Sequence, residues 1–343
     1  MSYLGGSGSS ASDPYIIDEL EDLPPLLTNF TNGINYIAFP EIYDGPKVLD
    51  MRSKGWFTNF INMYRSNDSS IYTVNKNVYF NGWTILGMSI KDGSFFKFQR
   101  DGSGAASNYV VRFYDMIIKD MYVLAVSSDS FVFRLDSSYG AQLVFYRCKI
   151  SAILDAQYVR CGLFVNTVDE EEFHIRNCSF NINFITTGTA YSRRITIIND
   201  YHRGRFSVYN TIFSLNSKKY HGGRGGNYDE EFFRCSNVRF CKFIGNIIVK
   251  ALYSAGNGMP LISGLSGCVY NVIDIALNIT SSASFSIINS FNSGVNVFNT
   301  EHITANTTYS ISASNCVQCN DSQMTDASWL TDHSFLVGTP PST

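Results

Sequence analysis

The segment FHIRNCSFNINF, residues 173–184, alternates apolar and polar residues, slips by one position, and then alternates again. The apolar residues up to Ile175 share one parity, and those from Cys178 onward share the other. Successive side chains of a strand point to opposite faces, so one straight strand cannot hold both runs on one face. The slip therefore predicts two strands that face the same core, joined by a sharp bend at Asn177.

The same slip recurs along the chain at intervals of 27 to 34 residues. The first residue after each slip lies at 83, 116, 148, 178, 211, 238, 272 and 300. A repeat of this length without helical periodicity is typical of a solenoid or a propeller, but a propeller blade needs about 40 to 45 residues. Tight hairpin dipeptides are also nearly absent. The sequence therefore predicts an all-β parallel β-helix of about eight coils.

The residue before each slip is the predicted bend, and these residues are Gly82, Asp115, Arg147, Asn177, Asn210, Asn237, Asn271 and Asn299. Gly, Asn and Asp tolerate positive φ, which turns an extended chain sharply. Asn177, Asn210 and Asn237 are expected to have positive φ and to stack about 4.8 Å apart in neighbouring coils. The seventh repeat leaves a second register open, in which Ile273 and Ile275 face inward.

The motif apolar-x-apolar-x-Asn-apolar-x-apolar, one copy per coil, resembles the right-handed parallel β-helix proteins of the pectate-lyase-like type. The resemblance covers roughly residues 70–315. In that family a left-handed Asn commonly occupies the two-residue bend, and stacked coils form Asn ladders. The resemblance implies a right-handed β-helix. It leaves the function open, because this fold serves lyases, hydrolases, adhesins and phage tailspikes.

Composition agrees with a strand-rich chain, since aromatic residues favour strands and the sequence has 26 Phe and 21 Tyr. The formal net charge of −3 gives no sign of nucleic-acid binding. No apolar run is long enough for a membrane-spanning helix, so no membrane insertion is expected. The first residues lack the basic start and apolar stretch of a secretory signal.

Three regions are predicted: a flexible leader with an N-terminal adaptor or cap at 1–65, the β-helix at 66–315, and a C-terminal cap at 316–343. A short helix is expected from Lys47 to Arg65.

A second short helix, capped by Thr325, is expected near the C-terminus. It should lay Trp329, Leu330 and Phe335 over the last coil.

The cysteines beside the bends, Cys148, Cys178 and Cys235, are expected to be small buried apolar side chains. Cys316 and Cys319 form a lone Cys-x-x-Cys pair. A structural zinc site needs four ligands, and no second pair of suitable spacing follows. We therefore expect no metal site and no cofactor.

Glycan-cleaving β-helices use carboxylates, either as a pair for hydrolysis or, in metal-dependent lyases, as a cluster around calcium. The catalytic candidates are Asp200, Asp229, Glu230 and Glu231. Local spacing does not show whether carboxylates of different coils meet on one face. Residues in the expected inter-coil loops could instead bind sugar rings by stacking and hydrogen bonding. These glycan-binding candidates are Tyr191, Tyr201, His202, Arg203, Tyr220 and Tyr228.

Two classes of function remain open. The first is a phage virion appendage, fibre or tailspike-like, assembled in the host cytoplasm. Its residues 1–65 would bind other virion proteins, and its coils would recognise a host surface polysaccharide. The order of parts is similar to phage tailspikes, and the closing segment resembles the ends of β-helix proteins from gut bacteria and their phages. The alternative is a polysaccharide-degrading lyase or hydrolase.

A homotrimer is expected, because large apolar residues also occupy outward parities. Ile117, Ile212, Ile273 and Ile275 are the examples. Exposed apolar patches of this kind usually mark interfaces.

Overall fold

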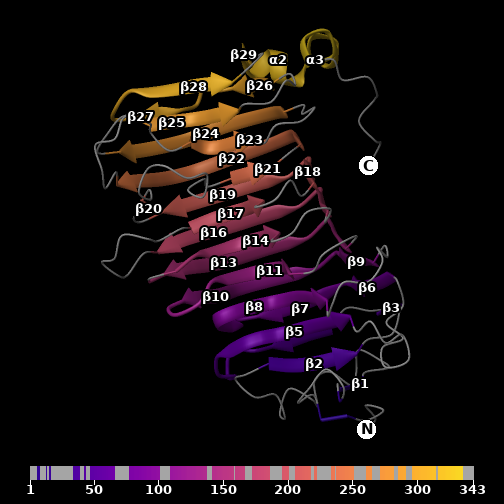
Figure 1. Ribbon diagram of the computed structural model, residues 1–343. Coiled ribbons are helices and arrows are strands. Elements are labelled where there is room, and N and C mark those ends of the chain that lie inside the picture. The colour runs from indigo at the N-terminus through magenta and orange to yellow at the C-terminus, as the bar shows by residue number, and fades with distance from the viewer. Residues whose placement is uncertain are drawn as a thin grey trace.

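The computed structural model of the 343-residue chain describes residues 6–7, 13, 15–16, 34–38, 42–43, 47–65, 77–100, 109–136, 141–157, 159–166, 172–185, 195–200, 205–217, 220–221, 233–235, 237–250, 260–264, 271–281, 285–290, 296–313 and 316–334. Strands dominate these residues, and each pairs in parallel with strands of the coils before and after it (Figure 1). The chain is a parallel β-solenoid with little helix, as the repeat predicts. No helix among the described residues is long and apolar enough to span a membrane.

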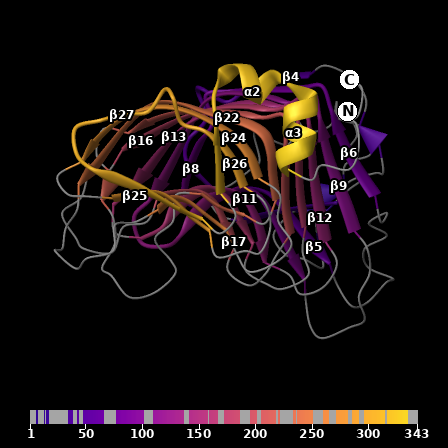
Figure 2. The same ribbon diagram turned by 90° about the horizontal axis from the view of Figure 1, so that it is seen from above.

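The strands fall into three rows that surround one core (Figure 2). The first row contains β3 (Ile42–Tyr43), β6 (Asn77–Asn81), β9 (Tyr109–Tyr114), β12 (Ala141–Tyr146), β15 (Glu172–Arg176), β18 (Arg205–Tyr209), the starts of β22 (Asn237–Lys250) and β24 (Asn271–Ser281), β26 (Asn296–Asn299) and β29 (Cys316–Cys319).

The second row follows the predicted bends. It contains β4 (Lys47–Asp50), β7 (Trp83–Leu86), β10 (Ile117–Ala125), β13 (Lys149–Ala156), β16 (Ser179–Ile185), β19 (Ile212–Ser217), the rest of β22 and β24, and β27 (Thr304–Ala305), while β20 (Tyr220–His221) pairs with the end of β22.

The third row closes each coil. It contains β2 (Ile34–Ala38), β5 (Phe57–Arg65), β8 (Ser89–Arg100), β11 (Ser130–Asp136), β14 (Cys161–Asn166), β17 (Ile195–Asp200), β21 (Phe233–Cys235), β23 (Pro260–Gly264), β25 (Phe285–Ser290) and β28 (Tyr309–Ala313), and β1 (Tyr15–Ile16) pairs with β2. The first residues of β8 also pair with β10 of the second row.

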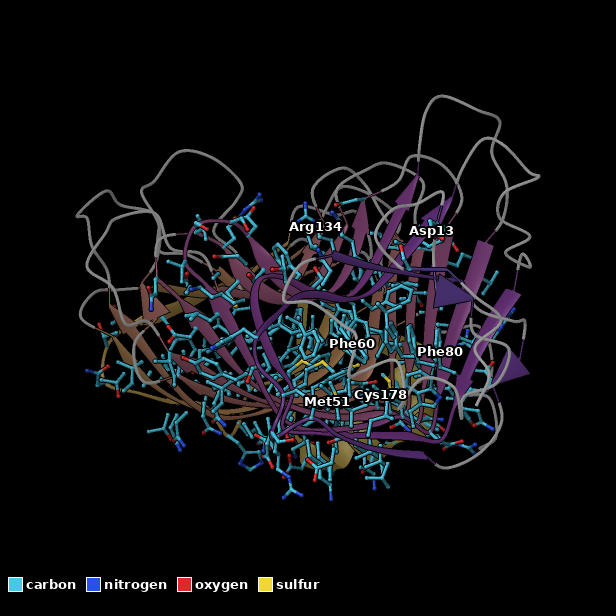
Figure 3. All side chains as sticks on the ribbon, turned by 90° about the horizontal axis from the view of Figure 1, so that it is seen from below. Asp13, Met51, Phe60, Phe80, Arg134 and Cys178 are labelled. Atoms are coloured by element: carbon cyan, nitrogen blue, oxygen red, sulfur yellow. The ribbon has the colours of Figure 1, made fainter. Side chains whose placement is uncertain are left out.

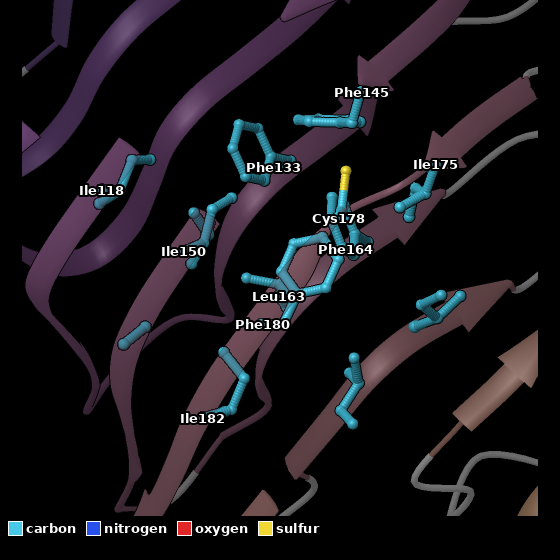
Figure 4. Packing of buried hydrophobic residues seen from close by; sticks show 14 of the residues in the cluster. Ile118, Phe133, Phe145, Ile150, Leu163, Phe164, Ile175, Cys178, Phe180 and Ile182 are labelled. Atoms are coloured by element: carbon cyan, nitrogen blue, oxygen red, sulfur yellow. The ribbon is translucent and has the colours of Figure 1, made fainter. Parts of the chain in front are cut away.

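Inward side chains of equivalent positions stack from coil to coil, and the side chains fill the interior (Figure 3). The ring of Phe113 lies 4.8 Å from that of Phe145 in the next coil, with the planes 13° apart. Phe133 and Phe164 of the third row meet Phe145 edge-on, at 4.6 and 5.2 Å (Figure 4). Each aromatic pair contributes about 0.5 to 1.5 kcal/mol beyond its area burial, so the stacks hold neighbouring coils together.

Positive φ occurs at the predicted bends over the first coils. The angles are 71° at Gly82, 54° at Asp115, Arg147 and Asn177, and 44° at Asn210. Asn210 donates a hydrogen bond from its side-chain amide to Oδ1 of Asn177, at 2.9 Å. Arg147 and Asp115 form the equivalent contact two coils earlier, an ion pair of 2.7 Å. The bend prediction is confirmed at these positions, and the corner ladder contains both amides and charges.

The bend predicted at Asn237 is wrong. Asn237 is the first residue of β22 and pairs with Ser207, so the corner of that coil falls at the register shift between Arg239 and Cys241. The alternation of apolar residues can change parity at two places in this segment, so that the second strand begins either at Val238 or at Cys241. Pairing with the preceding coil selects the second, because Val238 then lies opposite Val208.

The bend predicted at Asn271 is also wrong. Asn271 lies within β24 opposite Asn296, and Ile273 and Ile275 are buried in the core. The second register of this repeat is therefore the one adopted, and these two isoleucines do not face outward as expected.

Asn299 ends β26 at a turn, as predicted, but it is not among the described residues with positive φ. Its side chain is buried, and Oδ1 accepts a hydrogen bond from the backbone N–H of Glu301 at 3.2 Å. A side chain that bonds the backbone two residues ahead closes the turn without a left-handed residue.

The helix expected from Lys47 to Arg65 is wrong. These residues form β4 and β5, which pair in parallel with β7 and β8 and so continue the rows of the solenoid. Phe57, Phe60 and Ile61 have a helix-like spacing, and all three are buried. The spacing arises from a register shift after Phe57, because a bulge changes which side chains face inward. The predicted boundary at residue 66 lies outside the described residues.

The C-terminal segment folds over the last coil as two short helices, α2 (Asp321–Thr325) and α3 (Ala327–Ser334). Asn320 caps α2, with its side chain accepting from the N–H of Gln323. Asp326 accepts from two N–H groups at the start of α3, so it takes the capping role that was predicted for Thr325.

Leu330 of α3 is buried with Val297 and Cys319 of the adjacent strands, and Trp329 packs against the same cluster. The expected covering of the last coil is confirmed for these two residues. Phe335 lies outside the described residues.

Replacement of Asn177 by Val is predicted to destabilise the protein by about 1 to 3 kcal/mol, because a β-branched residue is strained at positive φ. The variant also loses the hydrogen bond to Asn210. Equilibrium denaturation in urea measures the change. Asn177→Gly is the control, since Gly accepts this φ and should cost less. Equal losses in both variants would show that the backbone conformation is unimportant.

Candidate functional site

Of the catalytic candidates, only the backbone position of Asp200 is described. Asp200 is the last residue of β17 and lies opposite Asn166 of β14. Asp229, Glu230 and Glu231 lie outside the described residues. The catalytic candidates therefore stay predictions.

The predicted glycan-binding residues have a similar outcome. Tyr220 begins β20 and pairs with Val249 of β22. The remaining candidates, Tyr191, Tyr201, His202, Arg203 and Tyr228, lie outside the described residues. The described part of the chain does not bring this set together.

The cysteine prediction is confirmed for Cys148 and Cys178, which are buried in successive coils. Burial, followed by the neighbouring Cys148 thiol, raises the pKa of Cys178. A buried thiol with a raised pKa forms little thiolate and is a structural side chain rather than a nucleophile. For Cys235 the structure gives only the backbone position, at the end of β21. Cys319 is buried, and its Sγ lies 3.8 Å from Sδ of Met324.

Aromatic and basic side chains lie in line on the outward face of the first row. The strand pairing places Tyr114, Tyr146, Arg176 and Tyr209 opposite one another in successive coils. We call these four residues the Tyr–Arg column. Residues directly opposite in parallel strands are about 4.8 Å apart, so the column forms one continuous strip along the solenoid.

The aromatic part of the column is held by contacts with the corner. The rings of Tyr114 and Tyr146 meet edge-on with their centroids 5.8 Å apart. The guanidinium carbon of Arg147 lies 4.7 Å from the centre of the Tyr146 ring, a cation–π contact. Arg147 also pairs with Asp115, which raises its pKa. The corner ladder therefore positions the tyrosines beside it.

Arg176 differs from Arg147 because it forms no ion pair with a described side chain. Its side chain is exposed at the end of β15, one residue before the bend. Its place in the column lies between Tyr146 and Tyr209. The guanidinium is available for a ligand, with an aromatic residue in the coil on each side.

Polar residues also lie at the start of β15, the opposite end of the strand from Arg176. Glu172 accepts a hydrogen bond from the Gln142 amide at 3.1 Å, and its Oε2 lies 2.9 Å from Nε2 of His174. Glu172 lies opposite Gln142 in the preceding coil. The Glu172 carboxylate is therefore already in contact with Gln142 and His174.

A sequence signal for the column exists, although sequence reasoning centred on the loops and missed it. The residue directly before each bend points outward, because side chains of a strand alternate and the residue one position earlier faces the core. Tyr114, Tyr146, Arg176 and Tyr209 all hold this position, directly before Asp115, Arg147, Asn177 and Asn210.

A second cluster lies where the solenoid meets the C-terminal helices. Side-chain atoms of Glu301, His302 and Asp321 lie within 4.8 Å of one another, and all three residues are exposed. Asp321 accepts a hydrogen bond from Asn299 at 2.6 Å and lies 3.0 Å from Nε2 of His302. Glu301 accepts from the N–H of Asp321. These are residue types that bind metals, but the contacts among them explain the cluster as a link between α2 and the last coil.

No protein-family model matches the chain, and no curated protein sequence matches it. The kind of ligand that fits the Tyr–Arg column therefore follows from the chemistry of its four side chains.

The link between His302 and Asp321 is predicted to be pH-dependent. The hydrogen bond to Asp321 raises the pKa of His302 above its usual 6.5, and the same bond lowers the pKa of Asp321 below 3.8. A raised His pKa stabilises the fold below pH 6.5, and this contribution is lost as pH rises through the folded value. A lowered Asp pKa stabilises above pH 3.8, and this contribution is lost as pH falls through the folded value.

We therefore expect His302→Gln to lower the melting temperature at pH 5 to 6 more than at pH 9, measured by differential scanning calorimetry. Lys54→Gln is the control, because Lys54 is remote from the cluster along the solenoid. The same loss at both pH values would contradict the expected linkage.

Proposed function

We propose that this chain is a phage virion appendage protein, fibre or tailspike-like, that recognises a host surface glycan along its solenoid. The Tyr–Arg column is the observation that carries the proposal. Tyrosine combines an apolar ring face with a polar hydroxyl, which suits contact with a sugar ring and its hydroxyl groups. The column repeats once per coil, so it can follow a repeating polymer.

The proposed shaft is a right-handed β-helix of about eight coils that associates as a homotrimer. Support comes from apolar side chains on the outward face of the second row. Val48, Ile212 and Ile248 are exposed by 64%, 43% and 40%, respectively. Val48 and Ile212 belong to one outward column, which strand pairing continues through Thr84, Ile117, Lys149 and Ser179. Apolar exposure of this extent favours an interface, and cyclic symmetry closes the assembly.

Residues 1–65 are proposed to bind other virion proteins, while the coils bind the glycan. The leader is rich in Gly and Ser, a composition that suits a segment that becomes ordered in a contact. β4 and β5 pair with strands of the next coil, so backbone hydrogen bonds connect this end of the chain to the shaft.

Deletion of residues 1–30 is predicted to leave a folded trimer that no longer joins virions. Light scattering measures the trimer mass, and sedimentation of particles assembled with the truncated protein measures incorporation. The full chain is the matched control. A monomeric full chain, or a truncated chain that sediments with virions, would contradict the proposed assembly.

Glycan recognition is tested separately by adsorption of the purified full chain to host cells. Adsorption should fall when surface polysaccharide is removed enzymatically, because the glycan is the proposed receptor. Undiminished adsorption to stripped cells would overturn the glycan as receptor.

A further inference from the structure

We propose that the glycan bound at the Tyr–Arg column is acidic, with its carboxylates held by Arg176 between Tyr146 and Tyr209. This inference rests on the proposed function and names the class of polysaccharide. It is carried by the position of Arg176, by its lack of an ion pair with any described side chain, and by the partners that the nearby carboxylates already have.

Strand pairing fixes the position of Arg176. Arg176 lies opposite Tyr146 in the preceding coil and opposite Tyr209 in the following coil. Both tyrosines are half-buried, so their rings are supported by neighbouring residues and still reach the surface. A sugar lying along the column would contact a ring on each side of the guanidinium.

The lack of a partner separates Arg176 from the other charged groups nearby. Arg147 is engaged by Asp115 and by the Tyr146 ring. Glu172 is engaged by His174 and Gln142. Arg176, in contrast, is exposed and has no ion pair with any described side chain. A planar guanidinium with free N–H groups matches the two oxygens of a carboxylate.

The charge of the surroundings favours an acidic rather than a neutral ligand. Asp115, directly after Tyr114, and Glu172, at the other end of β15 from Arg176, each already have a hydrogen-bonded partner, so they compete little for Arg176. The register continues the column to the position of Arg239, opposite Tyr209.

The tyrosines contribute affinity that charge alone would not give. Arginine on an open surface binds a single carboxylate weakly, because water and salt screen the pair. Ring contacts on both sides of the guanidinium exclude part of that water and orient the sugar. The column therefore favours uronic-acid-type residues, which carry a carboxylate on a pyranose ring, over a simple anion.

The test is affinity electrophoresis of the full chain in native gels that contain one polysaccharide each. Hyaluronan, alginate and polygalacturonate are the acidic probes, and dextran, mannan and laminarin are the neutral probes. We expect at least one acidic probe to retard the protein. We expect Arg176→Gln to weaken that binding roughly tenfold, as the loss of a charge-assisted hydrogen bond predicts.

Two further variants keep the test specific. Tyr209→Leu should also weaken binding, because it removes a ring and keeps an apolar side chain. Arg52→Gln is the matched control, since Arg52 is an exposed arginine on a turn before β5, is paired with Asp50, and lies outside the column. Its binding should equal that of the unmodified chain. Circular dichroism melting curves confirm that each variant is folded.

The outcomes separate this inference from the proposed function. Retardation by neutral probes alone, or acidic binding that Arg176→Gln leaves unchanged in a folded variant, overturns the acidic-glycan inference and leaves glycan recognition standing. Retardation by none of the six probes, together with adsorption to stripped host cells, overturns both.

Discussion

In-register parallel pairing between successive coils is the constraint on which the rest of the structure depends. Each backbone hydrogen bond aligns one residue with its equivalent about 30 residues away, as in the pairing of Val144 with His174. A shift of one residue would move every inward Phe to the surface and every outward Tyr into the core. The positive φ at the corners preserves this register, because it lets two consecutive strands face the same interior. The Phe stacks, the corner ladder and the Tyr–Arg column all follow from that alignment.

Much of the fold could be predicted because its signals are local. The slip in parity and the Gly, Asn or Asp before it lie within eight residues, and they located the corners at Gly82, Asp115, Asn177 and Asn210. The failures occurred where local signals were equal or misleading. At Asn237 two slips of the same spacing compete, and only pairing with Val208 in the previous coil decides between them.

The candidate site was less predictable than the fold, and the reason is physical. Apolar side chains identify the inward face, but an outward residue such as Tyr146 has no pattern of its own that separates a ligand site from ordinary surface. The sequence-based candidates, such as Tyr201, are polar or aromatic residues between the predicted strands, where no periodicity fixes which side chains meet. The column became visible only when pairing placed Tyr146 and Tyr209 on either side of Arg176. Its sequence signal, a Tyr or Arg before each bend, has meaning once the bends are known.

The register itself is tested most directly by disulfide formation between coils. In the double variant Tyr146→Cys with Arg176→Cys, the two positions are directly opposite, within the range of Cα separations that a disulfide spans. In the comparison variant Tyr146→Cys with Ile175→Cys, the second position faces the core. Mild oxidation is expected to join positions 146 and 176 and to leave 146 and 175 unjoined, as detected by mass spectrometry of proteolytic peptides. A link between 146 and 175, with none between 146 and 176, would contradict the parallel register of β12 and β15.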